Sequence, residues 1–141
     1  MKNKALYLIL LAAALSAIVV WRFSPSTSSP DKSDLIKVTN PKPNSIISSP
    51  LTVTGEARGT WYFEADFPVY LYDAEGNELA VGIAQAQSDW MTENFVPFET
   101  ILVFETQKSE ISKGTLVFKK SNPSDLPEQN DEFVMPVKIS Q

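Results

Sequence analysis

Residues 61–73 alternate between apolar side chains and polar or amphipathic ones without interruption. The apolar set comprises Trp61, Phe63, Ala65, Phe67, Val69 and Leu71, and the other set includes Tyr62, Glu64, Asp66, Tyr70 and Tyr72. Successive side chains of a β-strand point to opposite faces, so this pattern predicts one long strand with one buried face. A face of this kind needs a second layer to cover it. The segment therefore predicts an all-β, antiparallel β-sandwich.

Shorter apolar segments separated by turn residues support the same fold class. They predict strands at residues 35–38, 51–57, 78–84, 98–105, 114–120 and 133–139. In the strand at 78–84, the alternation places Leu79, Val81 and Ile83 in the core. Pro68 and Pro136 have no N–H to donate, so each predicts a sheet edge or a local break.

The amino terminus predicts a membrane anchor. Lys2 and Lys4 precede an apolar run at residues 5–21, which is closed by Arg22. As a helix this run would reach roughly 25 Å, enough to cross a bilayer, and the basic residues before it predict a cytoplasmic amino terminus with the rest of the chain outside. The alternative is a cleaved secretory signal followed by secretion, because small residues at 12–16 offer a cleavage site. We therefore expect residues 1–22 to be a retained anchor or an uncleaved signal.

A flexible linker is predicted at residues 23–34, where Ser, Pro, Thr, Asp and Lys dominate. Residues 35–141 then have the size of one domain. Three of the 12 basic residues lie in the anchor and all 17 acidic residues follow it, so residues 23–141 carry a formal net charge of 9 minus 17, or −8. This charge argues against nucleic acid as a partner, since phosphate binding needs clustered Lys and Arg.

Four sequence strings, in this order, resemble one bacterial domain family. They are SPLTVTGEARG from Ser49, WYFEADFPVYLYD from Trp61, DWMTENFVPFE from Asp89 and GTLVFKKSNPSDLPE from Gly114. Together they are similar to the spore-germination-associated immunoglobulin-like domain. The resemblance implies an immunoglobulin-like sandwich outside the cytoplasm, with no catalytic or binding residues to carry over. The cysteine pair of antibody domains is missing.

The chain contains neither His nor Cys, which excludes catalysis by Ser-His-Asp and Cys-His groups. Glu64 and Asp66 would share the outer face of the long strand, about 7 Å apart, so a small carboxylate-dependent hydrolase is an alternative. Asp73, Glu75 and Asn77 resemble the start of a calcium loop, but the required Gly and Glu positions do not follow. We expect no enzyme, no metal and no cofactor.

Two surfaces are candidates for partner contact. The first is the tyrosine row Tyr62, Tyr70 and Tyr72, which would lie on the polar side of the long strand and could stack on sugars or a protein. The second is the polar loop at residues 122–132, because sandwich domains usually bind through loops at one end. Its candidate contact residues are Asn122, Pro123, Asp125, Leu126 and Pro127.

The sequence as a whole predicts a membrane-anchored, extracytoplasmic binding or structural module of the bacterial cell envelope. Its expected partners are the membrane, through residues 5–21, and an envelope protein or glycan. A cell-wall glycan-binding domain that uses the tyrosine row is the alternative function of the same class.

Overall fold

The computed structural model describes residues 31–105 and 110–140, and these fold into β-structure. The strands are β1 (Ile36–Asn40), β2 (Ile46–Ile47), β3 (Leu51–Arg58), β4 (Asp66–Asp73), β5 (Glu78–Ala86), β6 (Phe95–Leu102), β7 (Ser112–Lys119) and β8 (Glu132–Ile139). Two single 3₁₀ turns accompany them, η1 (Gly59–Trp61) and η2 (Pro127–Gln129). The all-β prediction is confirmed for the described residues.

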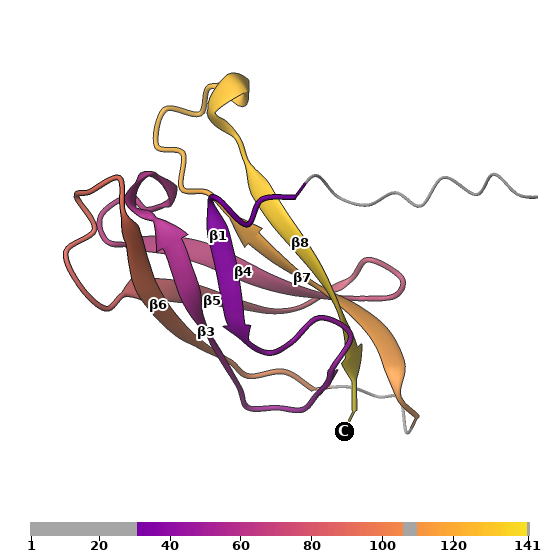
Figure 1. The fold of residues 1–141 in the computed structure, drawn as a ribbon. Helices are drawn as coiled ribbons and strands as arrows, with labels where there is room; N and C mark the ends of the chain where they lie inside the picture. Colours follow the sequence, from indigo (N-terminus) through magenta and orange to yellow (C-terminus); the bar gives the residue numbers. More distant parts are fainter. Residues whose placement is uncertain (1–30, 106–109, 141) are drawn as a thin grey trace, which may run out of the picture.

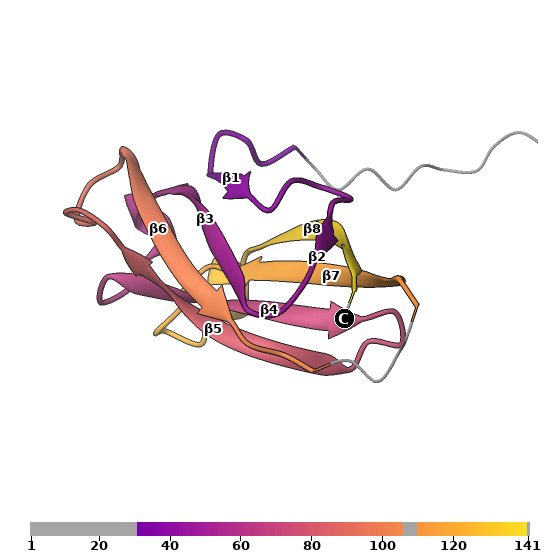
Figure 2. The ribbon, with the colours of Figure 1, turned by 90° about the horizontal axis from the view of Figure 1, so that it is seen from below.

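All eight strands belong to one hydrogen-bonded sheet in the order β1-β3-β6-β5-β4-β7-β8-β2. The sheet curls so that β1 and β3 lie across from β7 and β8, with the core between them (Figures 1 and 2). The β2–β8 pair is parallel, whereas the other pairs are antiparallel. The predicted antiparallel arrangement therefore holds for every pair except β2–β8. The two layers belong to one curled sheet, because a short β5–β6 ladder joins them.

Aromatic rings fill the centre of the core. Phe67 of β4 is fully buried and meets three rings edge-on, with centroid distances of 6.5 Å to Trp61, 5.1 Å to Tyr62 and 5.0 Å to Phe98. Edge-to-face pairs of this kind add to the stabilisation from burial itself. The expected inward position of Trp61 is confirmed, since its side chain is buried.

The long strand predicted at residues 61–73 is interrupted at its centre. Trp61 ends η1, and Phe63 and Asp66 exchange two backbone hydrogen bonds, of 3.0 and 3.2 Å, around Glu64 and Ala65. Both of these central residues have positive φ, 51° and 67°, as in a type I′ turn. The alternation therefore breaks, and Phe63, predicted to be in the core, is 43% exposed.

The predicted inward face of β5 holds at Leu79, which is half-buried and packs against the core, but is wrong at Val81 and Ile83, for a different reason. Tyr72 pairs with Glu78, but Leu71 pairs with Ala80, so Leu79 is an extra residue at a β-bulge. One extra residue moves every later side chain to the opposite face. Val81 and Ile83 are consequently 50% and 48% exposed.

Small residues of β5 face the core instead. Ala84 is fully buried and Gly82 is buried as well. A Cβ at Gly82 would lie 2.6 Å from Leu102 Cδ2 and 2.6 Å from Thr100 Oγ1. Gly82 thus lets β6 approach β5 where the sheet turns from one layer into the other.

The remaining strand predictions agree with the structure except that the strand predicted at residues 98–105 is β6, Phe95–Leu102, and that β2 was not predicted. The predicted core positions of β3 and of residues 133–139 are buried or half-buried. Pro68 precedes the β4–β7 ladder, which begins at Val69, and Pro136 lies on the side of β8 that β2 leaves open. Each proline therefore occupies an edge or a break, as its missing N–H requires.

The predicted anchor at residues 1–22 and most of the predicted linker lie outside the described residues. Within residues 31–105 and 110–140, no helix combines the length and the apolar character needed to span a bilayer.

Candidate recognition surfaces

The connection between β7 and β8 projects from one end of the sheet (Figure 1). Between this connection and the segment that follows η1 lies an open cleft of about 460 Å³. Residues from both segments line it: Thr60, Tyr62, Phe63, Lys120, Ser121, Asn122, Pro123, Ser124, Leu126 and Gln129. We call it the β7–β8 cleft. Its apolar surface comes mainly from Phe63 and Leu126, which are 43% and 49% exposed.

Hydrogen bonds within the connection hold its shape. The Asn122 side-chain amide donates to Leu126 O at 2.9 Å and to Asn130 Oδ1 at 2.8 Å, while Asn122 Oδ1 accepts from Ser124 N at 3.2 Å. Ser121 fixes the base of the connection, because its N–H donates to Trp61 O and its hydroxyl to Asp66 O. A loop ordered in this way loses less entropy when it binds a partner.

The cleft contains three of the five loop residues that the sequence predicted for partner contact. Asn122, Pro123 and Leu126 line it. Asp125, at a φ of 55°, and Pro127, the first residue of η2, belong to the same connection but do not line the cleft.

Sequence reasoning missed Phe63 and Lys120, which also line the cleft. Phe63 was assigned to the core because its position fits the alternating pattern. No local signal marked the turn that exposes it, since neither Glu64 nor Ala65 is a residue that favours positive φ.

The predicted tyrosine row does not exist as a surface row. Tyr62 is only 4% exposed, and its hydroxyl donates a 2.6 Å hydrogen bond to Val96 O. Burial raises the pKa of the Tyr62 phenol well above its usual value of 10.0. Tyr62 leaves the row because the turn after Phe63 ends the alternation on which the prediction depended.

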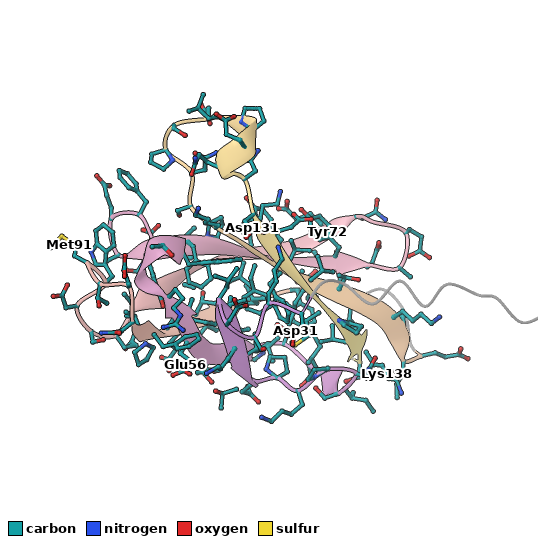
Figure 3. The ribbon with its side chains drawn as sticks, turned by 45° about the horizontal axis from the view of Figure 1, so that its top comes forward. Asp31, Glu56, Tyr72, Met91, Asp131 and Lys138 are labelled. Atoms are coloured by element: carbon teal, nitrogen blue, oxygen red, sulfur yellow. The ribbon has the colours of Figure 1, made fainter. Side chains whose placement is uncertain are left out.

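Tyr70 and Tyr72 do share the outer face of β4, and both are half-buried. Their rings stack at 6.0 Å with an interplanar angle of 18°, and Lys119 Nζ lies 5.0 Å from the Tyr70 ring centroid. Figure 3 shows Tyr72 on this face, far from Met91, which points outward at the opposite end of the molecule.

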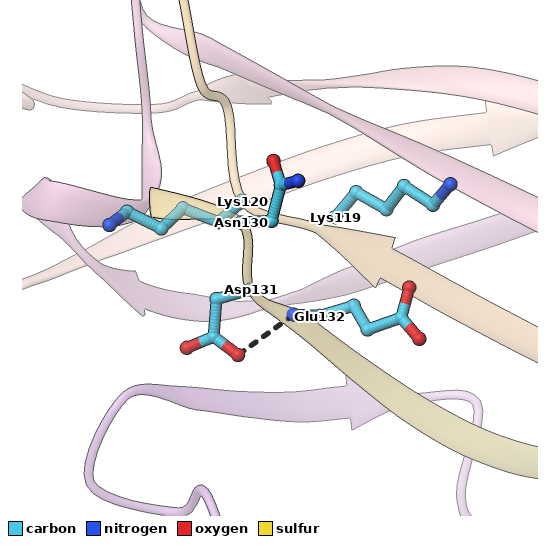
Figure 4. Close-up of a pocket in the computed structure, with 5 residues that line it drawn as sticks. All are labelled: Lys119, Lys120, Asn130, Asp131 and Glu132. Atoms are coloured by element: carbon cyan, nitrogen blue, oxygen red, sulfur yellow. Dashed lines mark hydrogen bonds between the residues drawn. The ribbon is translucent and has the colours of Figure 1, made fainter. Parts of the chain in front are cut away.

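A second hollow, of about 340 Å³, lies where β7 ends and β8 begins. Lys119, Lys120, Asn130, Asp131 and Glu132 line it, and the two lysine side chains point in opposite directions (Figure 4). Lys32 forms an ion pair with Asp131 and donates to Glu132 O at 2.7 Å. The hollow thus combines both signs of charge and is closed in part by contacts within the chain.

The carboxylates singled out by the sequence lie in turns or at the ends of β4. Glu64 lies in the turn and Asp66 begins β4, so they do not share a strand face, which corrects the geometry assumed for a hydrolase. Asp73 Oδ1 accepts from Glu75 N and Asn77 N at 2.9 and 2.8 Å and closes the β4–β5 turn. Among the described residues, no three carboxylates gather as metal ligands would.

The sequence of this sheet matches a known family model. The model of the immunoglobulin-like domain of bacterial spore germination, Gmad2, matches residues 35–126. The chain belongs to this family. The Gmad2 match confirms the resemblance seen in the four sequence strings, and it makes the curled sheet an immunoglobulin-like domain associated with spore germination. No match was found among curated proteins or among solved structures.

The matched segment of the Gmad2 domain includes much of the β7–β8 cleft. It covers η1, Phe63 and the connection as far as Leu126, and it ends before η2.

Proposed function

We propose that this Gmad2 chain is a non-catalytic binding module of the bacterial envelope, held outside the cytoplasm by a membrane anchor at residues 5–21. The β7–β8 cleft carries this proposal. Leu126, on a connection held by its own hydrogen bonds, lines it together with Lys120 and with Phe63 from the facing segment. Exposed apolar groups with a polar rim in a preformed cleft are typical of recognition sites.

The cleft can be tested in cells with a photo-crosslinking amino acid. The full chain carries the crosslinker at Leu126 or, as a control, at Ile46, which is 57% exposed on β2. We expect a discrete adduct from position 126 and none from position 46. Protease treatment removes the adduct of a protein partner, and muramidase treatment removes that of a glycan. Adducts of equal yield from both positions, or none from either, would refute recognition at the cleft.

Membrane topology can be tested separately because the chain contains no Cys. A single cysteine at Ser48, which is exposed, should react with a membrane-impermeant maleimide in intact cells. A single cysteine at Asn3 should react only after permeabilisation. Labelling of Asn3→Cys in intact cells, or protection of Ser48→Cys, would refute the orientation.

Glycan binding through the outer face of β4 is a second candidate function. The stacked pair of Tyr70 and Tyr72 favours it, because aromatic rings pack against the apolar faces of sugars. The full chain and a Tyr70→Ala/Tyr72→Ala variant would be sedimented with insoluble cell-wall glycan. Loss of sedimentation in the variant supports this function, and equal sedimentation excludes the face.

A further inference from the structure

The outer side of β5, where the bulge turns Val81 and Ile83 away from the core, adjoins further exposed apolar side chains in β6 and just after it. Val81, Ile83, Ile101 and Val103 are 50%, 48%, 57% and 71% exposed. Single exposed apolar residues are ordinary, but three on two neighbouring strands, with Val103 directly after β6, form a patch of the kind that marks interaction sites. We call these four residues the β5–β6 surface.

The two strands of this surface are neighbours in the sheet. They pair at Gln85 with Glu99 and at Ala86 with Phe98, and the contact of Gly82 with Leu102 keeps them close further along. Val81 also lies opposite Tyr70 of β4 in the ladder. The surface is thus continuous with the outer face of β4 and distinct from the β7–β8 cleft.

Acidic residues stand at both ends of the β5–β6 surface. Glu99 precedes Ile101 by two residues on β6, and Glu105 follows Val103 by two. Glu78 starts β5 on the side of Tyr72, next to the Tyr70–Val81 pair. All three glutamates are exposed. Within residues 31–105 and 110–140, Lys119 is a cation that its contact with Tyr70 places on this side, and it lies on β7, beyond β4.

This distribution of charge decides between two occupants. A second copy of the chain would bring its own glutamates against Glu78, Glu99 and Glu105, and like charges at an interface oppose association. A partner with Lys or Arg at its ends would meet these glutamates with opposite charge. From the charges and the exposed apolar residues, we infer that the β5–β6 surface docks an extended, basic-flanked apolar segment of another protein.

The spacing of the surface residues suits an extended partner. Val81 and Ile83 are two residues apart on β5, which corresponds to roughly 7 Å along the strand. Ile101 and Val103 have the same separation in the sequence, at the end of β6 and directly after it. An extended segment with apolar residues at every second position repeats at the same interval. Its flanking basic groups then fall near the acidic ends of the surface.

Two synthetic peptides test the inference directly. Both carry Val and Ile at alternate positions and polar neutral residues between them. One has two Lys at each end, and the other has two Glu. Binding of each to the full chain in detergent micelles is followed by fluorescence anisotropy. We expect the Lys-flanked peptide to bind at least about tenfold more tightly than the Glu-flanked one, and to weaken as salt is raised.

Matched variants locate the binding. Ile101→Thr removes apolar contact from the surface, whereas Ile46→Thr makes the same change at an equally exposed residue, 57% in each case, on β2. We expect Ile101→Thr to lower the affinity for the Lys-flanked peptide by about five- to tenfold, and Ile46→Thr to lower it by less than twofold. Since both residues are exposed, both variants should fold as the parent does.

Three results would overturn the inference. The first is equal binding of the two peptides, or no binding of either. The second is an equal response of the Ile101→Thr and Ile46→Thr variants. The third is a dimer in sedimentation equilibrium that Ile101→Thr dissociates, since this would assign the surface to a second copy of the chain. None of these results bears on the β7–β8 cleft, which the crosslinker at Leu126 tests independently.

Discussion

Gly82 provides the most direct test of which residues of β5 face the core. If Gly82 faces solvent, Gly82→Val should raise the free energy of unfolding, and if it faces the core, the same substitution should lower it. On a solvent-facing strand position, Gly82→Val would stabilise by up to about 1 kcal/mol, through the strand propensity of Val and a less flexible unfolded chain. In the structure Gly82 is buried, and a Cβ there would lie 2.6 Å from Leu102 Cδ2 and 2.6 Å from Thr100 Oγ1.

The magnitude follows from these two contacts. Each is about 1 Å shorter than a comfortable carbon contact. Neither neighbour can move into solvent easily, since Leu102 is fully buried and Thr100 is only 8% exposed. Overpacking of this kind costs about 1–3 kcal/mol, and the two methyl groups of Val add to it. We expect Gly82→Val to lower the free energy of unfolding by about 2 kcal/mol after the gain in propensity is subtracted.

Urea unfolding of the full chain, followed by tryptophan fluorescence, measures this change as a lower midpoint with an unchanged slope. Val81→Thr is the matched control on the adjacent residue, and its effect should stay within about 0.5 kcal/mol because Val81 is half exposed. A Gly82→Val variant at least as stable as the parent, together with a Val81→Thr loss above about 1.5 kcal/mol, would refute the bulge and the side-chain order it produces.

Four further substitutions test the turn and the aromatic core. Phe67→Ala should lower the free energy of unfolding by about 3–5 kcal/mol, because Phe67 is fully buried, whereas Phe63→Ala should lower it by less than about 1 kcal/mol. Urea unfolding measures both changes, and similar losses would contradict the core position of Phe67 and the surface position of Phe63. Ala65→Gly should raise the free energy of unfolding by about 1 kcal/mol, since Ala65 has a φ of 67°, which glycine adopts more easily. Thermal unfolding measures this change, and a less stable variant would argue against the turn. The raised pKa of Tyr62 contributes stability that is full below pH 10 and is lost as pH rises from 10 toward the raised pKa, because the unfolded chain ionises first. Tyr62→Phe should therefore flatten the loss of stability between about pH 9 and about pH 11, and an unchanged profile would show that Tyr62 is not its source.

Local patterns were sufficient to predict each strand of the described residues except the two-residue β2, and most of the core. The positions of β3 and β8 follow from the alternation of their own residues, as the burial of Val53 and Met135 shows. Gly76 lies in the β4–β5 turn at a φ of 83°, which a glycine adopts without steric cost. Pro68 and Pro136 predicted a sheet edge or a break, because proline has no N–H to donate to a neighbouring strand.

The candidate site was predicted only in part, because its two sides come from distant segments. Asn122, Pro123 and Leu126 were chosen from their loop, but the loop faces Phe63 and Thr60, about 60 residues earlier in the chain. Only the folded chain brings these segments together, through the hydrogen bonds of Ser121 to Trp61 and Asp66.

The sequence by itself determined that this chain is a β-protein of the Gmad2 family with a predicted apolar amino terminus, because alternation, turn residues and family motifs are all local in the sequence. Tertiary structure decided which face each segment presents. A turn at Glu64 and Ala65 and one extra residue at Leu79 are each too small to disturb a local pattern. The turn changes the faces of the residues before it, so Tyr62 became buried and Phe63 exposed, while Phe67 kept its predicted place in the core. The extra residue in β5 changes the faces of the residues after it, so Val81 and Ile83 became surface.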